Sequence, residues 1–191
     1  VALCAHYRVA TPSARLGFPE VNLGLLPGAG GTQRLPRIVG VQKALEMVTS
    51  GKPISADEAL ASGLIDEIAP DKDLRARAIA FARDMVTSGK PLVKVRDNNA
   101  KLAPAQAGLE IFVNFRKANA RKHRGFLAPE YNIRCIEAAV RSKTFEEGLA
   151  EEHKLFRELI GGPQSAAQRY AFFAERQAAK IPDVPDDTPV R

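Results

Sequence analysis

The chain has 191 residues, a formal net charge of +6 and 45% hydrophobic residues. This length suits one domain with an appendage, and the composition is ordinary for a globular protein that buries a core. No apolar run approaches the ~20 residues of a membrane helix, which argues against a transmembrane span. The chain begins VALCA, with neither Met nor a signal-peptide pattern. We therefore expect it to start inside a domain whose front is missing, and to be cytoplasmic.

The basic residues are densest in residues 116–124, RKANARKHR. A solvated helix face explains this segment most simply, and contact with a phosphate-bearing small ligand is the next interpretation. Nucleic acid is not an expected partner, because no aromatic stacking platform accompanies the charge. The cysteines Cys4 and Cys135 are far apart, and the three histidines are isolated from them and from one another. No metal site is expected from such spacing.

The first half of the chain alternates short strands with short helices, an α/β pattern. Thr32 is a plausible N-cap, and Ser55 with Glu58 forms a capping-box pattern before another helix. The expected strands cover residues 7–10, 15–18 and 64–68, and the expected helices cover residues 33–39, 41–49, 56–62 and 74–87.

The second half carries apolar positions at helical spacing only. Helices are predicted for residues 105–123, 129–141, 145–159 and 164–180. Residues 181–191, IPDVPDDTPVR, contain three prolines and no periodicity, which is typical of a linker. We therefore divide the chain into an α/β part (1–92), a helical region (93–180) and a linker (181–191).

Glu20 is the strongest candidate for chemistry. It follows Phe18 and Pro19 at the end of a predicted strand and has apolar neighbours, including Val21 and Leu23. Desolvation by such neighbours raises the pKa of a carboxyl group towards neutrality, which suits proton transfer near pH 7. The alternative is a surface glutamate in a loop.

A glycine-rich turn follows Glu20. Residues 27–32, PGAGGT, open a predicted helix, and glycines there let backbone N–H groups approach a water, a carbonyl oxygen or a phosphate. The spacing is neither the dinucleotide fingerprint nor a Walker loop. A purely structural tight turn is the alternative.

Taken together, residues 17–36, GFPEVNLGLLPGAGGTQRLP, closely resemble the active-site segment of the crotonase (enoyl-CoA hydratase/isomerase) superfamily. Residues 45–51, LEMVTSG, and 56–66, ADEALASGLID, are similar to the family's continuation. The resemblance covers residues 1–92 and implies the C-terminal portion of a crotonase-like (ββα) superhelical core. The helical region after it is similar to bifunctional hydratase/3-hydroxyacyl-CoA dehydrogenases of fatty-acid β-oxidation, and residues 181–191 look like the connection to a dehydrogenase domain.

The resemblance implies an enoyl-CoA hydratase, with Δ3,Δ2-enoyl-CoA isomerase as a further activity and an acyl-CoA thioester as substrate. Glu20 matches a catalytic glutamate that acts as general acid/base. Gly28 matches the glycine whose backbone N–H helps to hold the catalytic water. No cofactor or metal is expected in this segment, and NAD is expected only for a dehydrogenase domain. Residues 116–124 are a candidate contact for the ADP phosphates of CoA.

The family's second catalytic glutamate and both oxyanion-hole donors would lie upstream of Val1. Loss of one oxyanion donor typically costs about 10²–10³ in rate. The chain by itself is therefore predicted to be nearly inactive, whereas its parent protein is predicted to be active.

An alternative of a different class is a non-catalytic assembly module that docks a partner through its helical half. The two interpretations are compatible, because crotonase-type domains often associate through their C-terminal helices. A homo-oligomer formed through these helices is therefore also expected.

Overall fold

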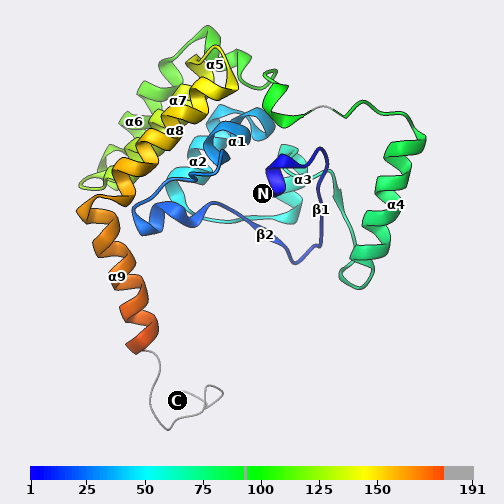
Figure 1. Ribbon diagram of the computed structural model, residues 1–191, viewed down its shortest axis with the longest axis horizontal. Coiled ribbons are helices and arrows are strands. Elements are labelled where there is room, and N and C mark those ends of the chain that lie inside the picture. Colours follow the sequence, from blue (N-terminus) through cyan, green and yellow to red (C-terminus); the bar gives the residue numbers. More distant parts are fainter. Residues whose placement is uncertain (93, 179–191) are drawn as a thin grey trace.

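The computed structural model describes residues 1–92 and 94–178 of the chain. The predicted linker at 181–191 lies outside the described residues. The α/β class is confirmed: small sheets and helices alternate in the first half, and helices without strands follow it over the described residues 94–178 (Figure 1).

Four short strands make two small sheets in the first half. Strand β1 (Val9–Ala10) pairs in parallel with β4 (Glu67–Ile68), with Val9 opposite Glu67. Strand β2 (Arg15–Leu16) pairs antiparallel with β3 (Ile54–Ser55). The sequence prediction missed β3, because two residues are too few to show a period.

The helices of the first half largely match the predicted ranges. They are α1 (Gly31–Val39), α2 (Val41–Ser50), α3 (Ala56–Ser62) and α4 (Leu74–Thr87). The Ser55 side chain accepts a hydrogen bond from the Glu58 N–H at 3.2 Å, which confirms the N-cap of α3. The Glu58 carboxylate does not complete the capping box but pairs with Lys43.

Within residues 94–178, the second half contains five α-helices: α5 (Ala103–Ala107), α6 (Glu110–His123), α7 (Leu127–Arg141), α8 (Phe145–Ile160) and α9 (Pro163–Ala178). The prediction of one helix over residues 105–123 was wrong. Gly108 is extended, with φ −159° and ψ 121°, and separates α5 from α6. Helix α7 begins before Pro129, which sits in the first turn, where its missing N–H breaks no helical hydrogen bond.

Helix α7 connects the two halves of the chain. It packs against α1, α2 and α8, while α4 lies apart on the far side of β1 and α9 points away from the body (Figure 1). The larger apolar cluster accordingly joins Leu35 and Leu45 of the first half to Phe112 and Ile136 of the second. Both halves therefore share one hydrophobic core.

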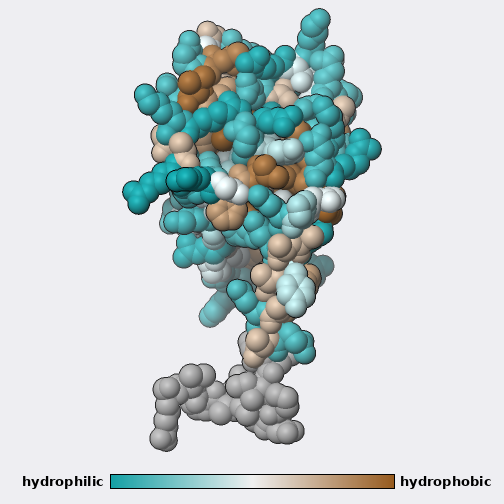
Figure 2. All heavy atoms as spheres, turned by 90° about the vertical axis from the view of Figure 1, so that its left-hand side faces the viewer, coloured by the Kyte–Doolittle hydropathy of each residue, from teal (hydrophilic) through white to brown (hydrophobic). Residues whose placement is uncertain are grey.

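A smaller apolar cluster lies under the glycine-rich turn. Leu25 and Leu26 pack there against Ala128, Cys135, Leu155 and Leu159. Cys135 is buried as a small apolar residue, whereas Cys4 is exposed. The outer face of the helical layer is mostly hydrophilic, with its apolar residues in separate small patches (Figure 2).

Replacing Leu155 tests the importance of this smaller cluster. Leu155 is 0% exposed, so Leu155→Ala should lower the free energy of unfolding by about 2–5 kcal/mol through lost burial and a cavity. Leu60 of α3 is 41% exposed, and the same substitution there should change stability by less than about 0.5 kcal/mol. Urea denaturation of both variants measures the difference, and equal losses would contradict this packing.

Candidate active site

Glu20 lies in a short 3-10 helix, Pro19–Leu23, rather than in an extended strand end. Pro19 occupies its first position, where a missing N–H costs nothing. The helix ends at Gly24, whose φ of 68° is left-handed and suits glycine. The Leu25 N–H closes the turn by donating to the Glu20 carbonyl oxygen at 3.0 Å. The backbone on both sides of Glu20 is thereby fixed.

Glu20 and Gly28 line the same cavity, which has a volume of about 140 Å³. The structure thus brings together the two residues that the sequence singled out. The cavity lies at the N-terminus of α1, and its wall is mostly apolar or backbone. Its other lining residues include Leu3, Cys4, Phe18, Pro27, Gly31 and Arg34.

The environment of Glu20 favours the neutral form of its carboxyl group. Burial raises the pKa of Glu20 above its ordinary value, and a hydrogen bond from its own backbone N–H offsets part of that rise. The Oε2 atom is buried and has no hydrogen-bond partner among the described residues. A half-buried carboxyl group with a free oxygen is suited to giving or taking a proton.

The glycine-rich turn presents backbone N–H groups beside Glu20. Helix α1 begins at Gly31, and its cap residue Gly30 has a left-handed φ of 77°. The N–H of Gly28 donates to no acceptor within the described residues, so it is free to bind a ligand. A Cβ atom on residue 28 would lie 2.5 Å from Cδ2 of Phe156 on α8, so only glycine fits there.

Glu152 of α8 is a buried residue at the glycine-rich turn that the sequence analysis missed. It is 0% exposed, and its carboxylate accepts hydrogen bonds from the Gly30 N–H at 2.6 Å and the Thr32 N–H at 3.1 Å. The Thr32 hydroxyl also donates to it. The prediction of Thr32 as the N-cap of α1 was therefore wrong: Thr32 is inside the helix, and Glu152 caps the helix from a distant part of the chain.

A signal for Glu152 was present in the sequence. The buried positions of α8 are Phe145, Gly148, Glu152, Leu155 and Leu159, which recur every three or four residues. A glutamate in such an apolar stripe must find buried donors. The stripe marks the residue as unusual, but it does not reveal which donors it meets.

The basic segment 116–124 covers the end of α6 and its C-cap residue Arg124, and none of its residues lines the Glu20 cavity. Arg116 binds two carboxylates, with Nη2 at 2.8 Å from Glu130 and 3.1 Å from Glu137. Ion pairing on a helix face therefore accounts for Arg116. Within the described residues, no group of three or more His, Cys, Asp or Glu side chains is arranged to hold a metal ion.

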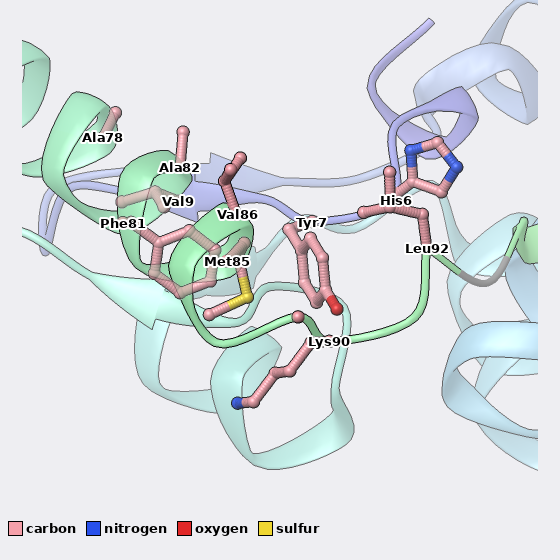
Figure 3. Close-up of a pocket in the computed structure, with 11 residues that line it drawn as sticks. His6, Tyr7, Val9, Ala78, Phe81, Ala82, Met85, Val86, Lys90 and Leu92 are labelled. Carbon is pink, nitrogen blue, oxygen red and sulfur yellow. The ribbon is translucent and has the colours of Figure 1, made fainter.

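A larger cavity of about 530 Å³ lies between β1 and α4 (Figure 3). Its lining is largely apolar, and the rings of Tyr7 and Phe81 meet edge to face with centroids 5.7 Å apart. His6 and Lys90 are its polar side chains besides Tyr7, and none of its lining residues is a carboxylate. Of these two cavities, only the smaller one at Glu20 can therefore support carboxylate chemistry.

Comparison with known proteins identifies the family of the chain. Residues 1–121 match the family model described as enoyl-CoA hydratase/isomerase, which is well over half of the chain. The chain belongs to the enoyl-CoA hydratase/isomerase family. Glu20, Gly28 and α1 all lie in the matched part, whereas Glu152 and Phe156 lie beyond it.

Relatives and solved structures support the same family. The chain is 43% identical over 180 residues to the peroxisomal bifunctional enzyme of Homo sapiens, covering 94% of this chain and 24% of that protein. It is 36% identical over 192 residues to the fatty acid oxidation complex subunit alpha of Shewanella loihica, covering 99% of this chain and 27% of that protein. A carnitinyl-CoA hydratase structure from Mycobacterium avium matches with a TM-score of 0.55 and 26% identity, covering 92% of this chain and 54% of that one. The chain thus spans about a quarter of the length of these curated relatives.

The raised pKa of Glu20 makes stability depend on pH. As pH rises above the ordinary carboxyl pKa of about 4.3, the unfolded chain loses the Glu20 proton before the folded chain does, so folding becomes less favourable. Glu20→Gln removes this effect. The melting temperature of the variant should exceed that of the wild type at pH 7, and the gap should close below about pH 4. A gap that stays constant across this range, measured by thermal denaturation, would contradict the assigned burial.

The contact between Gly28 and Phe156 predicts a second effect on stability. Gly28→Ala should lower the free energy of unfolding by about 1–3 kcal/mol, because the added methyl group overlaps the ring. Adding Phe156→Leu to the Gly28→Ala variant should recover part of the loss. Urea denaturation of the single and double variants measures this, and a Gly28→Ala variant as stable as wild type would refute the contact.

Proposed function

We propose that this chain supplies half of the catalytic equipment of an enoyl-CoA hydratase, in which Glu20 exchanges a proton with the α-carbon of a 2-enoyl thioester. The observation that carries the proposal is the half-buried Glu20 carboxyl group, with a raised pKa, in one cavity with the free Gly28 N–H. Membership of the enoyl-CoA hydratase/isomerase family supports an acyl-CoA thioester as substrate.

Hydration needs two proton transfers and a stabilised enolate. A carboxylate removes a proton from water, the hydroxide adds to the β-carbon, and the electrons move to the thioester oxygen. A carboxyl group then delivers a proton to the α-carbon. Glu20 suits the α-carbon step because its pKa lies above that of an exposed glutamate. Gly28 suits the holding of water because it lines the same cavity and its N–H donates to no acceptor in the part of the chain that the structure describes.

The resemblance of residues 17–36 assigns the remaining groups to sequence upstream of Val1. These groups are a second glutamate and two N–H donors for the enolate oxygen. Activity is therefore to be measured in a protein that includes this upstream segment. Glu20 could also carry a proton between two carbons of one substrate, as Δ3,Δ2-enoyl-CoA isomerisation requires, because one carboxyl group suffices for such a shuttle.

We further propose that the parent protein is bifunctional, with 3-hydroxyacyl-CoA dehydrogenase as its second activity and NAD bound only there. The support is that relatives named as bifunctional enzymes match along 94% of this chain, and that the chain spans only about a quarter of their length. The cytoplasmic location stays a prediction, since some relatives carry the names peroxisomal or glyoxysomal. Among the described helices, none is both long and apolar enough to cross a bilayer.

A role in assembly remains a second proposal for the helical region. Tyr170 and Phe173 on α9 are 77% and 64% exposed, which is unusual for aromatic side chains one turn apart. They support association through the C-terminal helices. If substitutions on α9 dissociate a complex and leave thioester binding intact, assembly belongs to α9 and catalysis to the Glu20 cavity.

Substitution of Glu20 tests the catalytic proposal. In a protein extended upstream of Val1, Glu20→Gln should lower kcat for crotonyl-CoA hydration by about 10²–10⁴-fold, because the amide cannot transfer the proton. Glu46, exposed on α2, provides the control, and Glu46→Gln should keep wild-type activity. The loss of absorbance of the conjugated thioester measures the rate. If the Glu20→Gln variant keeps more than a few per cent of the activity, Glu20 is not the proton donor.

A further inference from the structure

One face of α8 forms a wall of the glycine-rich turn. Glu152 caps the start of α1, and Phe156 covers Gly28. Leu149 lies on the same face, with Cδ1 3.6 Å from where a Cβ on Gly30 would sit. Spacings of three and four residues place all three side chains on one side of a helix. This part of the contact surface of the turn therefore comes from α8, outside the part matched by the family model.

Glu152 makes the polar contacts of this wall. Its carboxylate receives three donors, and no ion pair to it is found among the described residues. Burial raises the pKa of Glu152, and the hydrogen bonds from Thr32 and Gly30 work in the opposite direction. The N-terminus of α1 stabilises a negative charge there through its N–H groups and its dipole.

The hydrogen bonds around Thr32 indicate an ionised Glu152. The Gln33 side-chain amide donates to the Thr32 hydroxyl oxygen at 3.0 Å and to the Cys135 carbonyl oxygen at 3.0 Å. The Thr32 hydroxyl then donates its own proton to Glu152. A carboxylate that accepts hydrogen bonds from this hydroxyl and from two N–H groups acts only as an acceptor, which is the behaviour of the ionised form.

Glu152 also determines which N–H groups of the turn remain available. It occupies those of Gly30 and Thr32, whereas the Gly28 N–H keeps no partner among the described residues. Without this anchor, the N–H groups of Gly30 and Thr32 would need other acceptors. These two N–H groups would then be additional donors for a water or substrate oxygen in the cavity.

We propose that Glu152 is a positioning residue for hydration: its ionised carboxylate fixes the turn so that the Gly28 N–H and the Glu20 carboxyl group face one reacting centre. This inference rests on the function proposed above. Glu152 touches neither the substrate nor the water and acts through the turn. Its loss should therefore lower kcat more than it changes KM.

The test uses Glu152→Gln in the protein extended upstream of Val1. The amide is similar in size, but its NH₂ group must face either the two donors of Thr32 or the Gly30 N–H. We expect kcat to fall about 10–100-fold with KM within about threefold of wild type, since small displacements of catalytic groups cost rates of this size. Hydrogen exchange at the Gly30 and Thr32 amides should become faster. Glu151→Gln, next along the same helix but partly exposed, is the matched control and should change neither.

Thr32→Val is the second variant, which removes only the hydroxyl donor and keeps the Thr32 N–H. It should lower kcat about 3–10-fold, and the double variant should be no slower than Glu152→Gln, because both changes disrupt one anchor. If Glu152→Gln does not fold, the Thr32→Val result decides: an unchanged kcat overturns the inference.

The outcomes separate the two proposals. A wild-type extended protein without hydratase activity would refute the proposed function, and faster amide exchange in the Glu152→Gln variant would still show the anchor. An active wild type with a Glu152→Gln variant that keeps kcat within about twofold would refute the positioning role alone.

Discussion

The first turn of α1 must find acceptors for its backbone N–H groups, and this requirement organises the region around Glu20. A nearby side chain usually provides such an acceptor, but here Glu152 provides it from across the fold. A buried carboxylate without these donors would be costly, and so would donors without the carboxylate. Helix α8 is consequently held against the glycine-rich turn, while the larger core that the two halves share is built through α6 and α7.

The two carboxyl groups at this end of α1 illustrate how environment separates roles. Glu152 has three hydrogen-bond donors and no access to solvent, which suits a fixed charge. Glu20 has a buried oxygen without a partner among the described residues and a cavity in front of it, which suits a group that changes its proton. Leaving the buried Glu20 oxygen without a hydrogen bond lowers the free energy of unfolding. Such a cost is expected where a residue is kept for chemistry rather than for folding.

The sequence predicted the local features of the site and missed the long-range ones. Glu20 and Gly28 are eight residues apart within one continuous motif, so the chain itself brings them into one cavity. Glu152 is separated from Gly30 by 122 positions, and no local pattern connects them. Thr32 resembled an N-cap by residue type, yet the acceptor from α8 displaced it from that role. The break at Gly108 was missed because apolar positions keep a helical spacing on both sides of it.

The part of the chain matched by the family model and the helices after it contribute different things to the site. The groups that would touch a thioester, Glu20 and the Gly28 N–H, depend on short-range geometry and lie within residues 1–121. Their alignment depends on Leu149, Glu152 and Phe156, which pack against the turn. To support the glycine-rich turn, a helix needs only a complementary shape and one buried acceptor, and helices of different sequence could provide both. The inner face of the helical region therefore holds the turn in place, whereas the proposed assembly role rests on the exposed aromatic side chains of α9.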